Sequence, residues 1–210
     1  FYTEPFSIFL EKLSKVSGFE SILTMNTGAE AVETAIKAAR RWGYFSKGIP
    51  EDKAEIIVAN GNFHGRTTTI VSFSSDASYK DGFGPFTPGF NSAEYCGSCD
   101  CQSIDSCLSI ESFEKKINNN TCAILVEPIQ GEAGIRVPTD GWLKQLRDLC
   151  TSRNILLILD EIQSGLGRTG KLFAYEHENI KPDGLILGKA LGGAILLSLI
   201  HISEPTRRIE

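Results

Sequence analysis

The sequence lacks the features by which several large classes of protein are identified. No apolar run approaches the roughly 20 residues that a membrane-spanning helix needs, and no secretory signal is visible at its start. Acidic residues outnumber basic ones, 26 to 21, so the charge gives no sign of a surface for nucleic acid or anionic membranes. No internal repeat is visible. What remains is a chain of ordinary globular composition, 41% hydrophobic and 22% charged, whose length suits one domain or slightly more.

Cysteine is the residue type that is over-represented, with six in 210 residues. Four of the six cluster in sequence: Cys96, Cys99, Cys101 and Cys107. Their C-x2-C-x-C-x5-C spacing differs from the two separated C-x2-C pairs of structural zinc sites, so we expect no metal. An exposed loop insertion over about 94–107 is favoured, with a disulfide and a metal site as alternatives. Cys122 and Cys150 have apolar or helical neighbours and are expected to be small core residues.

Short apolar runs alternate along the chain with segments of helical periodicity. The runs predict buried strands, and the periodic or alanine-rich segments predict helices. Strands are expected over 55–59, 70–73, 123–126, 155–159 and 185–188, and helices over 5–16, 29–45, 109–118 and 140–153. Residues 74–107 are rich in Gly, Ser, Pro and Cys and predict a long irregular segment. The alternation predicts an α/β fold with a mainly parallel sheet and helices on both faces.

Two of the expected strands end beside residues that can take part in chemistry. Asp160 follows the run 155–159, and Lys189 follows the run 185–188. The carboxyl ends of parallel strands line the crevice where open α/β sheets bind ligands, so the acid and the amine are expected at one site. Pyridoxal phosphate needs this pair, because a lysine binds it covalently and an aspartate keeps its ring nitrogen charged. On these residues alone, a solvated lysine and a helix-capping aspartate are the plainer alternatives.

A candidate phosphate site lies where the alanine-rich helix begins, at Thr27, Gly28 and Ala29. A helix N-terminus offers unpaired N–H groups and a partial positive charge, and glycine lets an anion approach the backbone closely. Thr27 also forms a T-x-x-E capping box with Glu30, so plain helix capping is the alternative.

Two further segments place polar or aromatic side chains after strands. Phe63 could stack on a planar ring, and Arg66 could bind a carboxylate with its planar fork of donors. A core phenylalanine and a solvated arginine are the alternatives, and His64 between them is expected to be a hydrogen-bonded loop residue. Glu127 and Glu132 flank another crevice position, with surface exposure as the alternative for both.

Six segments, taken in order, resemble one family. They are N-T-G-A-E-A at 26–31, G-N-F-H-G-R-T at 61–67, D-G-F-G-P-F-T-P-G-F at 81–90, V-E-P-I-Q-G-E-A-G at 126–134, D-E-I-Q-S-G-L-G-R-T-G at 160–170 and L-G-K-A-L-G-G at 187–193. They are similar to the class III pyridoxal-phosphate-dependent aminotransferases, and among these most similar to the ornithine aminotransferases. The resemblance covers about residues 1–195 apart from the cysteine-rich insertion. It implies the large domain of a fold-type I transferase, truncated, over residues 1–196.

The resemblance assigns the cofactor site residue by residue. Lys189 corresponds to the lysine that holds pyridoxal phosphate covalently and later moves the substrate proton. Asp160 corresponds to the partner of the ring nitrogen, and Gln163 to the residue that contacts the 3-oxygen of the ring. Phe63 corresponds to the aromatic residue that stacks on the ring.

The resemblance also assigns the residues that contact the cofactor phosphate and the substrate. Thr27, Gly28 and Ala29 correspond to the phosphate-binding segment. Arg66 corresponds to the arginine that binds the substrate α-carboxylate, and Glu132 to the glutamate that masks a second arginine, which binds 2-oxoglutarate. The implied reaction transfers the δ-amino group of L-ornithine to 2-oxoglutarate, giving glutamate 5-semialdehyde and glutamate. Another ω-amine, such as N-acetylornithine or 4-aminobutyrate, and a non-catalytic truncated protein are the alternatives.

The chain departs from the family at its ends. It is about half the family's length, without the N-terminal segment and the small C-terminal domain that carries the second arginine. Residues 197–210 differ wholly from the family, so we expect a non-native tail in which His201 has no role. The intact protein is expected to be a homodimer of the cytoplasm or the mitochondrial matrix, with neither a nucleic-acid nor a membrane partner.

Overall fold

A five-stranded sheet lies at the centre of the molecule, with all strands parallel and in the order β2-β1-β3-β4-β5. The computed structural model describes residues 3–97 and 107–193. The strands are β1 (Glu55–Ala59), β2 (Phe90–Ala93), β3 (Thr121–Val126), β4 (Leu156–Asp160) and β5 (Gly184–Ile186). The α-helices are α1 (Glu4–Ser17), α2 (Gly28–Trp42), α3 (Thr68–Ser72), α4 (Ala77–Lys80), α5 (Ser109–Lys116) and α6 (Trp142–Ser152). A π-helical segment (Gly43–Lys47) follows α2, and 3₁₀ turns cover Ala174–Glu178 and Lys189–Gly192.

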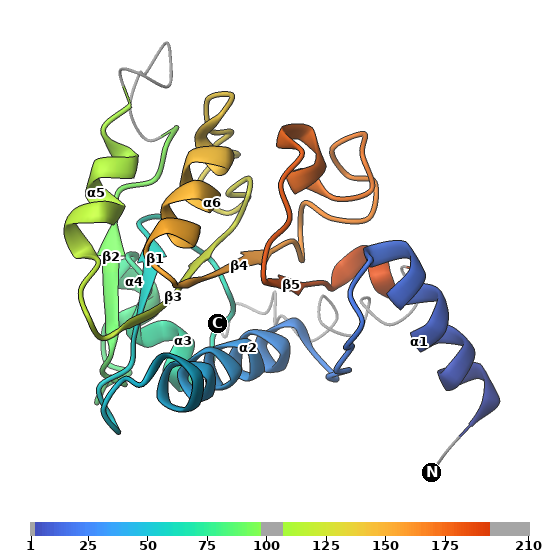
Figure 1. Cartoon of the computed structure of the whole chain (residues 1–210), viewed down its shortest axis with the longest axis horizontal. Coiled ribbons are helices and arrows are strands. Elements are labelled where there is room, and N and C mark those ends of the chain that lie inside the picture. The colour runs from blue at the N-terminus through green and yellow to red at the C-terminus, as the bar shows by residue number, and fades with distance from the viewer. Residues whose placement is uncertain (1–2, 98–106, 194–210) are drawn as a thin grey trace, which may run out of the picture.

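Helices cover both faces of the sheet, because successive side chains of each strand point to opposite faces. In β3, Ile124 belongs to the buried cluster that contains Phe113 of α5 and Trp142 of α6. Its neighbour Leu125 belongs to the other cluster, together with Val32 of α2. Figure 1 shows the corresponding layers, with α5 and α6 on one side of the strands and α2 and α3 on the other. The predicted parallel sheet with helices on both faces is therefore confirmed.

Helix α2 begins at a complete capping box. The Thr27 side chain accepts a hydrogen bond from the Glu30 N–H at 3.1 Å, and the Glu30 carboxylate accepts one from the Thr27 N–H at 3.2 Å. The helix then buries Val32, Ile36 and Ala39, which share one face because they are spaced four and three residues apart. Burying a valine or isoleucine side chain contributes about 1.5–3 kcal/mol, which fixes the helix against the sheet.

The strand predicted over 70–73 is wrong, because this segment belongs to helix α3 and the turn that follows it. Ile70 and Phe73 both pack into the cluster under α2. Residues three apart lie on the same side of a helix but on opposite sides of a strand. Packing therefore overrides the β propensity of the run of threonine, isoleucine and valine.

The segment 74–107 contains a strand that the sequence analysis did not predict. Strand β2 pairs with β1 through Phe90 opposite Ile56 and Ala93 opposite Ala59, and it forms one edge of the sheet. An edge strand needs less apolar sequence than a central one, and of its four residues Ala93 is the one that is buried. Edge strands as short as this one give almost no periodicity signal.

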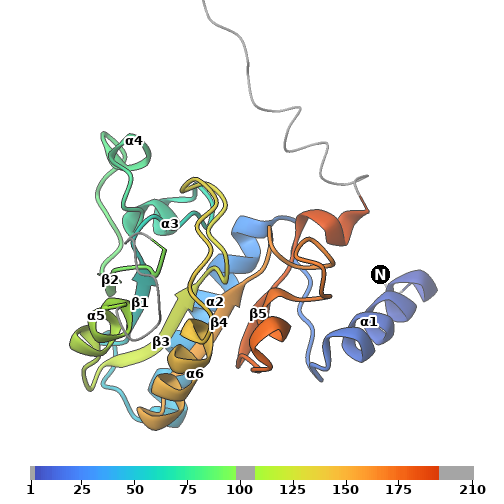
Figure 2. The same cartoon turned by 90° about the horizontal axis from the view of Figure 1, so that it is seen from above.

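The other predicted strands and helices match the structure within a few residues, whereas the short helix α4 lies in the segment that was predicted to be irregular. Helix α1 lies beyond β5 at the end of the molecule (Figure 2), where Lys181 Nζ donates a hydrogen bond to the carbonyl of Gly18 at 2.8 Å. Across the described residues, no helix is both long and apolar enough to cross a membrane. The predicted tail over residues 197–210 lies outside the described part of the chain.

Candidate functional site

The segments singled out in the sequence meet at one edge of the sheet. Residues 61–67 follow β1, residues 127–132 follow β3, residues 160–163 end or follow β4, and Lys189 lies shortly after β5. All four strands are parallel, so these segments lie at the carboxyl edge, where open α/β sheets bind ligands.

Asp160 is buried at the end of β4, and both of its carboxylate oxygens accept hydrogen bonds. Oδ2 lies 2.6 Å from Nδ1 of His64, which must donate because a carboxylate only accepts. Oδ1 accepts from the backbone N–H of Ile162 at 3.0 Å. The aspartate is therefore held in one orientation by a residue 96 positions away in sequence. The same hydrogen bond gives His64 a defined ring orientation.

Glu127 is a second buried acid at this edge, only 3% exposed. Its Oε2 accepts the backbone N–H of Phe63 at 3.1 Å, which ties the end of β3 to the loop after β1. Burial raises the pKa of Glu127 to about 7, the nearby charge of Asp160 acts in the same direction, and His64 opposes it. Surface exposure, the alternative considered for this residue, is therefore wrong for Glu127.

Glu132 is exposed, in contrast to Glu127, but it has a partner within the site. Its Oε1 accepts a hydrogen bond from Nε2 of Gln163 at 3.2 Å. A β-carbon at Gly131 would lie 2.3 Å from Oε1 of Gln163, so the glycine leaves room for the end of the Gln163 side chain. The structure thus brings together Gln163 and Glu132, two residues predicted to contact different parts of one cofactor–substrate complex.

The start of α2 and the turn that carries Lys189 lie on either side of Ile162. A β-carbon at Gly28 would stand 2.8 Å from Cδ1 of Ile162, and one at Gly188 would stand 3.2 Å from its Cγ2. Both glycines therefore make room for this side chain. Lys189 itself is exposed and opens its 3₁₀ turn with a φ of 40°, in the left-handed region that lysine rarely adopts. Strain of this kind is characteristic of functional positions.

The loop 61–67 reaches the same helix start through Gly65. Its φ is +127°, and a β-carbon there would lie 3.0 Å from the β-carbon of Ala29. Nearby, the exposed Arg66 has its guanidinium carbon 5.8 Å from the ring centre of Phe63 and 5.6 Å from that of Tyr79. These contacts are in the range of cation–π interactions, which orient the guanidinium at this edge.

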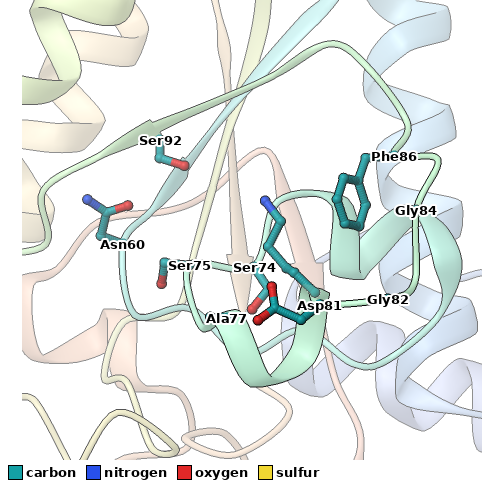
Figure 3. A pocket seen from close by; sticks show the side chains of 10 residues that line it. Asn60, Ser74, Ser75, Ala77, Asp81, Gly82, Gly84, Phe86 and Ser92 are labelled. Atoms are coloured by element: carbon teal, nitrogen blue, oxygen red, sulfur yellow. The ribbon is translucent and has the colours of Figure 1, made fainter.

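An open pocket of about 520 Å³ lies beside this site but does not include Lys189 or Asp160. Figure 3 shows Asn60, Ser75 and Ser92 on its wall, with Phe86 across from them. The wall is connected to the site, because Gly61 N donates to Oγ of Ser75 at 2.6 Å. The pocket is therefore a neighbour of the candidate site and not its centre.

The cysteine predictions are tested in part. Cys122 and Cys150 are fully buried, as predicted for small core residues. Cys96 and Cys107 are buried free thiols, so at these two positions the expected exposed loop is wrong; Thr139 N–H donates to Sγ of Cys96 at 3.4 Å. Cys99 and Cys101 lie outside the described residues. Among the residues that are described, no cluster of His, Cys, Asp and Glu could hold a metal ion.

Two residues of this site carried little signal in the sequence. His64 was expected only as a hydrogen-bonded loop residue, and Glu127 was expected to be exposed as readily as buried. The available clue was their position in the chain. His64 lies in the loop after β1, and Glu127 comes directly after β3, so both follow the carboxyl end of a strand.

Comparisons with known proteins agree on one family. The sequence model described as Aminotransferase class-III matches residues 1–207. The ornithine aminotransferase of Brevibacillus brevis is 55% identical over 195 residues, which are 93% of this chain and 46% of that protein. A crystal structure of Toxoplasma gondii ornithine aminotransferase, described as having partial occupancy of PLP at its active site, superposes with a TM-score of 0.83. It is 42% identical and covers 93% of this chain and 44% of its own.

A related specificity appears among the solved structures as well. The acetylornithine aminotransferase of Elizabethkingia anophelis has a TM-score of 0.73 and is 45% identical. It covers all of this chain and 50% of its own. The chain thus spans about half the length of each of these relatives.

Proposed function

This chain belongs to the class III aminotransferase family, and we propose that it is the cofactor-binding part of an ornithine aminotransferase. The complete protein would transfer the δ-amino group of L-ornithine to 2-oxoglutarate, giving glutamate 5-semialdehyde and glutamate. One observation carries the proposal: an acid, an amine, an aromatic ring and a helix start converge at one sheet edge in a chain 55% identical to ornithine aminotransferases.

The residues at this edge fit pyridoxal phosphate. Asp160 is a buried acceptor held by His64 and by the Ile162 N–H, which suits a positively charged ring nitrogen. The open backbone of Gly28 at the start of a 15-residue helix suits the phosphate. The exposed amine of Lys189 would provide the covalent bond, and Phe63 and Gln163 would contact the ring. When bound, the cofactor withdraws electrons from the substrate carbon, a chemistry that no side chain supplies.

Each residue then has a defined task in the reaction. Nζ of Lys189 would take and return the proton of the substrate carbon. Asp160 would keep a positive charge near its carboxylate throughout, since two hydrogen bonds hold it in one orientation. Arg66 would bind the substrate α-carboxylate through its planar fork of N–H donors. Glu132, exposed and hydrogen-bonded to Gln163, would occupy the arginine that later binds 2-oxoglutarate.

N-acetylornithine is the second candidate substrate, and a specific observation favours it. The Elizabethkingia acetylornithine aminotransferase matches the whole of this chain at 45% identity. The described site supports either amine donor.

We propose further that the complete protein is a homodimer. Large apolar side chains on the described surface support this, among them Phe45, Phe83 and Leu23, which are 61–76% exposed. Burying such side chains against a second copy would remove apolar surface from water.

The test uses the complete gene product with pyridoxal phosphate and 2-oxoglutarate. L-ornithine, N-acetylornithine and 4-aminobutyrate are offered separately, and glutamate and the semialdehyde products are measured. A preference for L-ornithine of at least tenfold in kcat/KM supports the proposal. A preference for N-acetylornithine or 4-aminobutyrate contradicts the proposed amine donor but leaves the assignment to the aminotransferase family unchanged. Stoichiometric cofactor binding with no transfer from any of the three amines contradicts the proposed reaction.

A further inference from the structure

Three ionisable side chains are buried together behind the cofactor-facing side of the site. Asp160, His64 and Glu127 are 4%, 3% and 3% exposed, and they come from three separate segments of the chain. Charged groups are rarely buried unless they are paired, so a cluster of two acids and one imidazole needs an explanation. Within the functions assigned above, only Asp160 has a role.

The geometry joins the three groups. Nδ1 of His64 donates to Oδ2 of Asp160 at 2.6 Å, while Nε2 of the same ring is buried without a hydrogen-bond partner in the described structure. Glu127 lies beside the histidine, because its Oε2 accepts the N–H of Phe63, the preceding residue. The carbonyls of Glu127 and Pro128 both accept from the Tyr95 hydroxyl, at 3.1 and 2.9 Å. The Glu127 backbone is therefore fixed and its carboxylate faces the histidine loop.

The two acids both favour the protonated form of His64. Burial alone would lower the pKa of His64, but the hydrogen bond and charge of Asp160 and the charge of Glu127 outweigh it, so the pKa is raised. Of the other titratable neighbours, burial raises the pKa of the Tyr95 phenol well above its usual value, so Tyr95 stays neutral. Asp160, His64 and Glu127 are therefore the groups whose charges decide the protonation of this cluster.

We propose that Glu127 and His64 are positioning residues for Asp160: the His64 ring holds the Asp160 carboxylate in one orientation, and ionisation of Glu127 favours the imidazolium form of that ring. The inference rests on the proposed function, since Asp160 is useful in this form only to a cationic cofactor ring. In the absence of Glu127, the histidine loses one of the two negative charges that favour its second proton, the one with the smaller effect. Asp160 then keeps its hydrogen bond but loses a neighbouring positive charge.

The direct test measures the ionisation of His64 by ¹⁵N NMR in the complete holoenzyme, with His64→Asn identifying the signal. We expect both ring nitrogens to be protonated at neutral pH in the wild type. In Glu127→Gln we expect the pKa of His64 to fall by about one unit, the size typical of losing a nearby opposite charge. A neutral His64 in the wild type at pH 7, or an unchanged titration in Glu127→Gln, overturns the proposal.

A second readout follows the bound cofactor. Its visible absorption band is titrated with pH in the wild type, in Glu127→Gln and in Glu161→Gln. Glu161 is a matched control, because it is a buried acid that accepts from the N–H groups of Ala174 and Tyr175 instead of facing His64. We expect a shift of the midpoint by at least half a unit in Glu127→Gln and none in Glu161→Gln. Equal midpoints in all three proteins contradict the positioning role.

The outcomes separate this inference from the proposed function. If the wild-type protein shows no cofactor band at all, the proposed function fails, but the His64 titration in cofactor-free protein still tests the coupling to Glu127. If Glu127→Gln does not fold, Glu127→Asp is used in its place, because aspartate retains the carboxylate. That variant is expected to restore most of the wild-type His64 titration, and a fully shifted titration in it would count against the role of the Glu127 charge.

Discussion

The δ-carbon of Ile162 lies 2.8 Å from the point where a β-carbon on Gly28 would stand. Ile162 comes two residues after Asp160, and Gly28 opens α2. The same side chain also approaches Gly188, the residue before Lys189. One isoleucine thus sets the spacing between the proposed phosphate, ring and lysine positions, and this spacing depends on two residues having no side chain.

Gly28→Ala is expected to disturb that spacing. Its methyl group would overlap Ile162, which in packed sites costs about 1–3 kcal/mol of stability. Because the helix start would move relative to Asp160, we expect pyridoxal phosphate to bind at least tenfold more weakly, measured by fluorescence titration of the cofactor-free complete protein. Ile162→Val removes the overlapping carbon, so the double variant should recover most of the affinity. Unchanged cofactor affinity in Gly28→Ala would show that Ile162 adjusts freely.

Arg66→Lys tests the proposed carboxylate contact. Lysine keeps the charge but loses the planar fork, so we expect kcat/KM for L-ornithine to fall about 10- to 100-fold, mainly through KM. Arg41→Lys is the matched control, because its guanidinium also lies over a ring, 4.5 Å from the centre of Phe45, but at the far end of α2. Equal kinetic losses in the two variants would mean that Arg66 acts on stability and not on the substrate.

The strand–helix alternation was enough to predict most of the fold. The strands around Ile57, Ile124 and Leu157 are central and parallel, so they are apolar on both faces and stand out as continuous runs. Strand β2 was missed because it lies at the edge, is only four residues long and buries one of them. The 70–73 prediction failed because the packing of Ile70 and Phe73 on one side could not be known before α2 was placed.

The site was predicted from motifs that each carry a local reason, such as a glycine at a helix start or an acid at a strand end. The Asp160–His64 bond joins residues 96 positions apart, and no spacing in the sequence indicates it. The burial of Glu127 likewise depends on β1 and β3 being neighbours. Long-range pairings of this kind come from the sheet order and cannot be deduced from periodicity.

Thiol reactivity should rank the described cysteines. Burial raises the pKa of Cys122 to about 11 and that of Cys150 to about 12, so both stay protonated and unreactive near neutral pH. The pKa of Cys107 is lowered, because hydrogen bonds from Ser109 and Cys96 outweigh the opposing effect of its burial. Iodoacetamide labelling of the native complete protein, followed by peptide mass spectrometry, should modify Cys107 before Cys122 and Cys150. Labelling of Cys122 or Cys150 at the same rate would contradict the ranking.

The pH dependence of stability should carry a contribution from Glu127 with a defined sign. Its pKa is about 7 in the folded state against 4.5 for the free side chain, so the folded protein binds the proton more tightly. The resulting stabilisation is fully present below pH 4.5 and is lost as the pH rises toward 7, by about 3 kcal/mol.

Glu127→Gln cannot titrate, so its thermal midpoint should change less than that of the wild type between pH 4.5 and 7. The comparison is made by calorimetry on the complete protein, with Glu94→Gln, an exposed acid, as the control that should follow the wild type. Parallel pH profiles for the wild type and Glu127→Gln would mean that Glu127 is already ionised across this range, and the burial argument for its pKa would then be wrong.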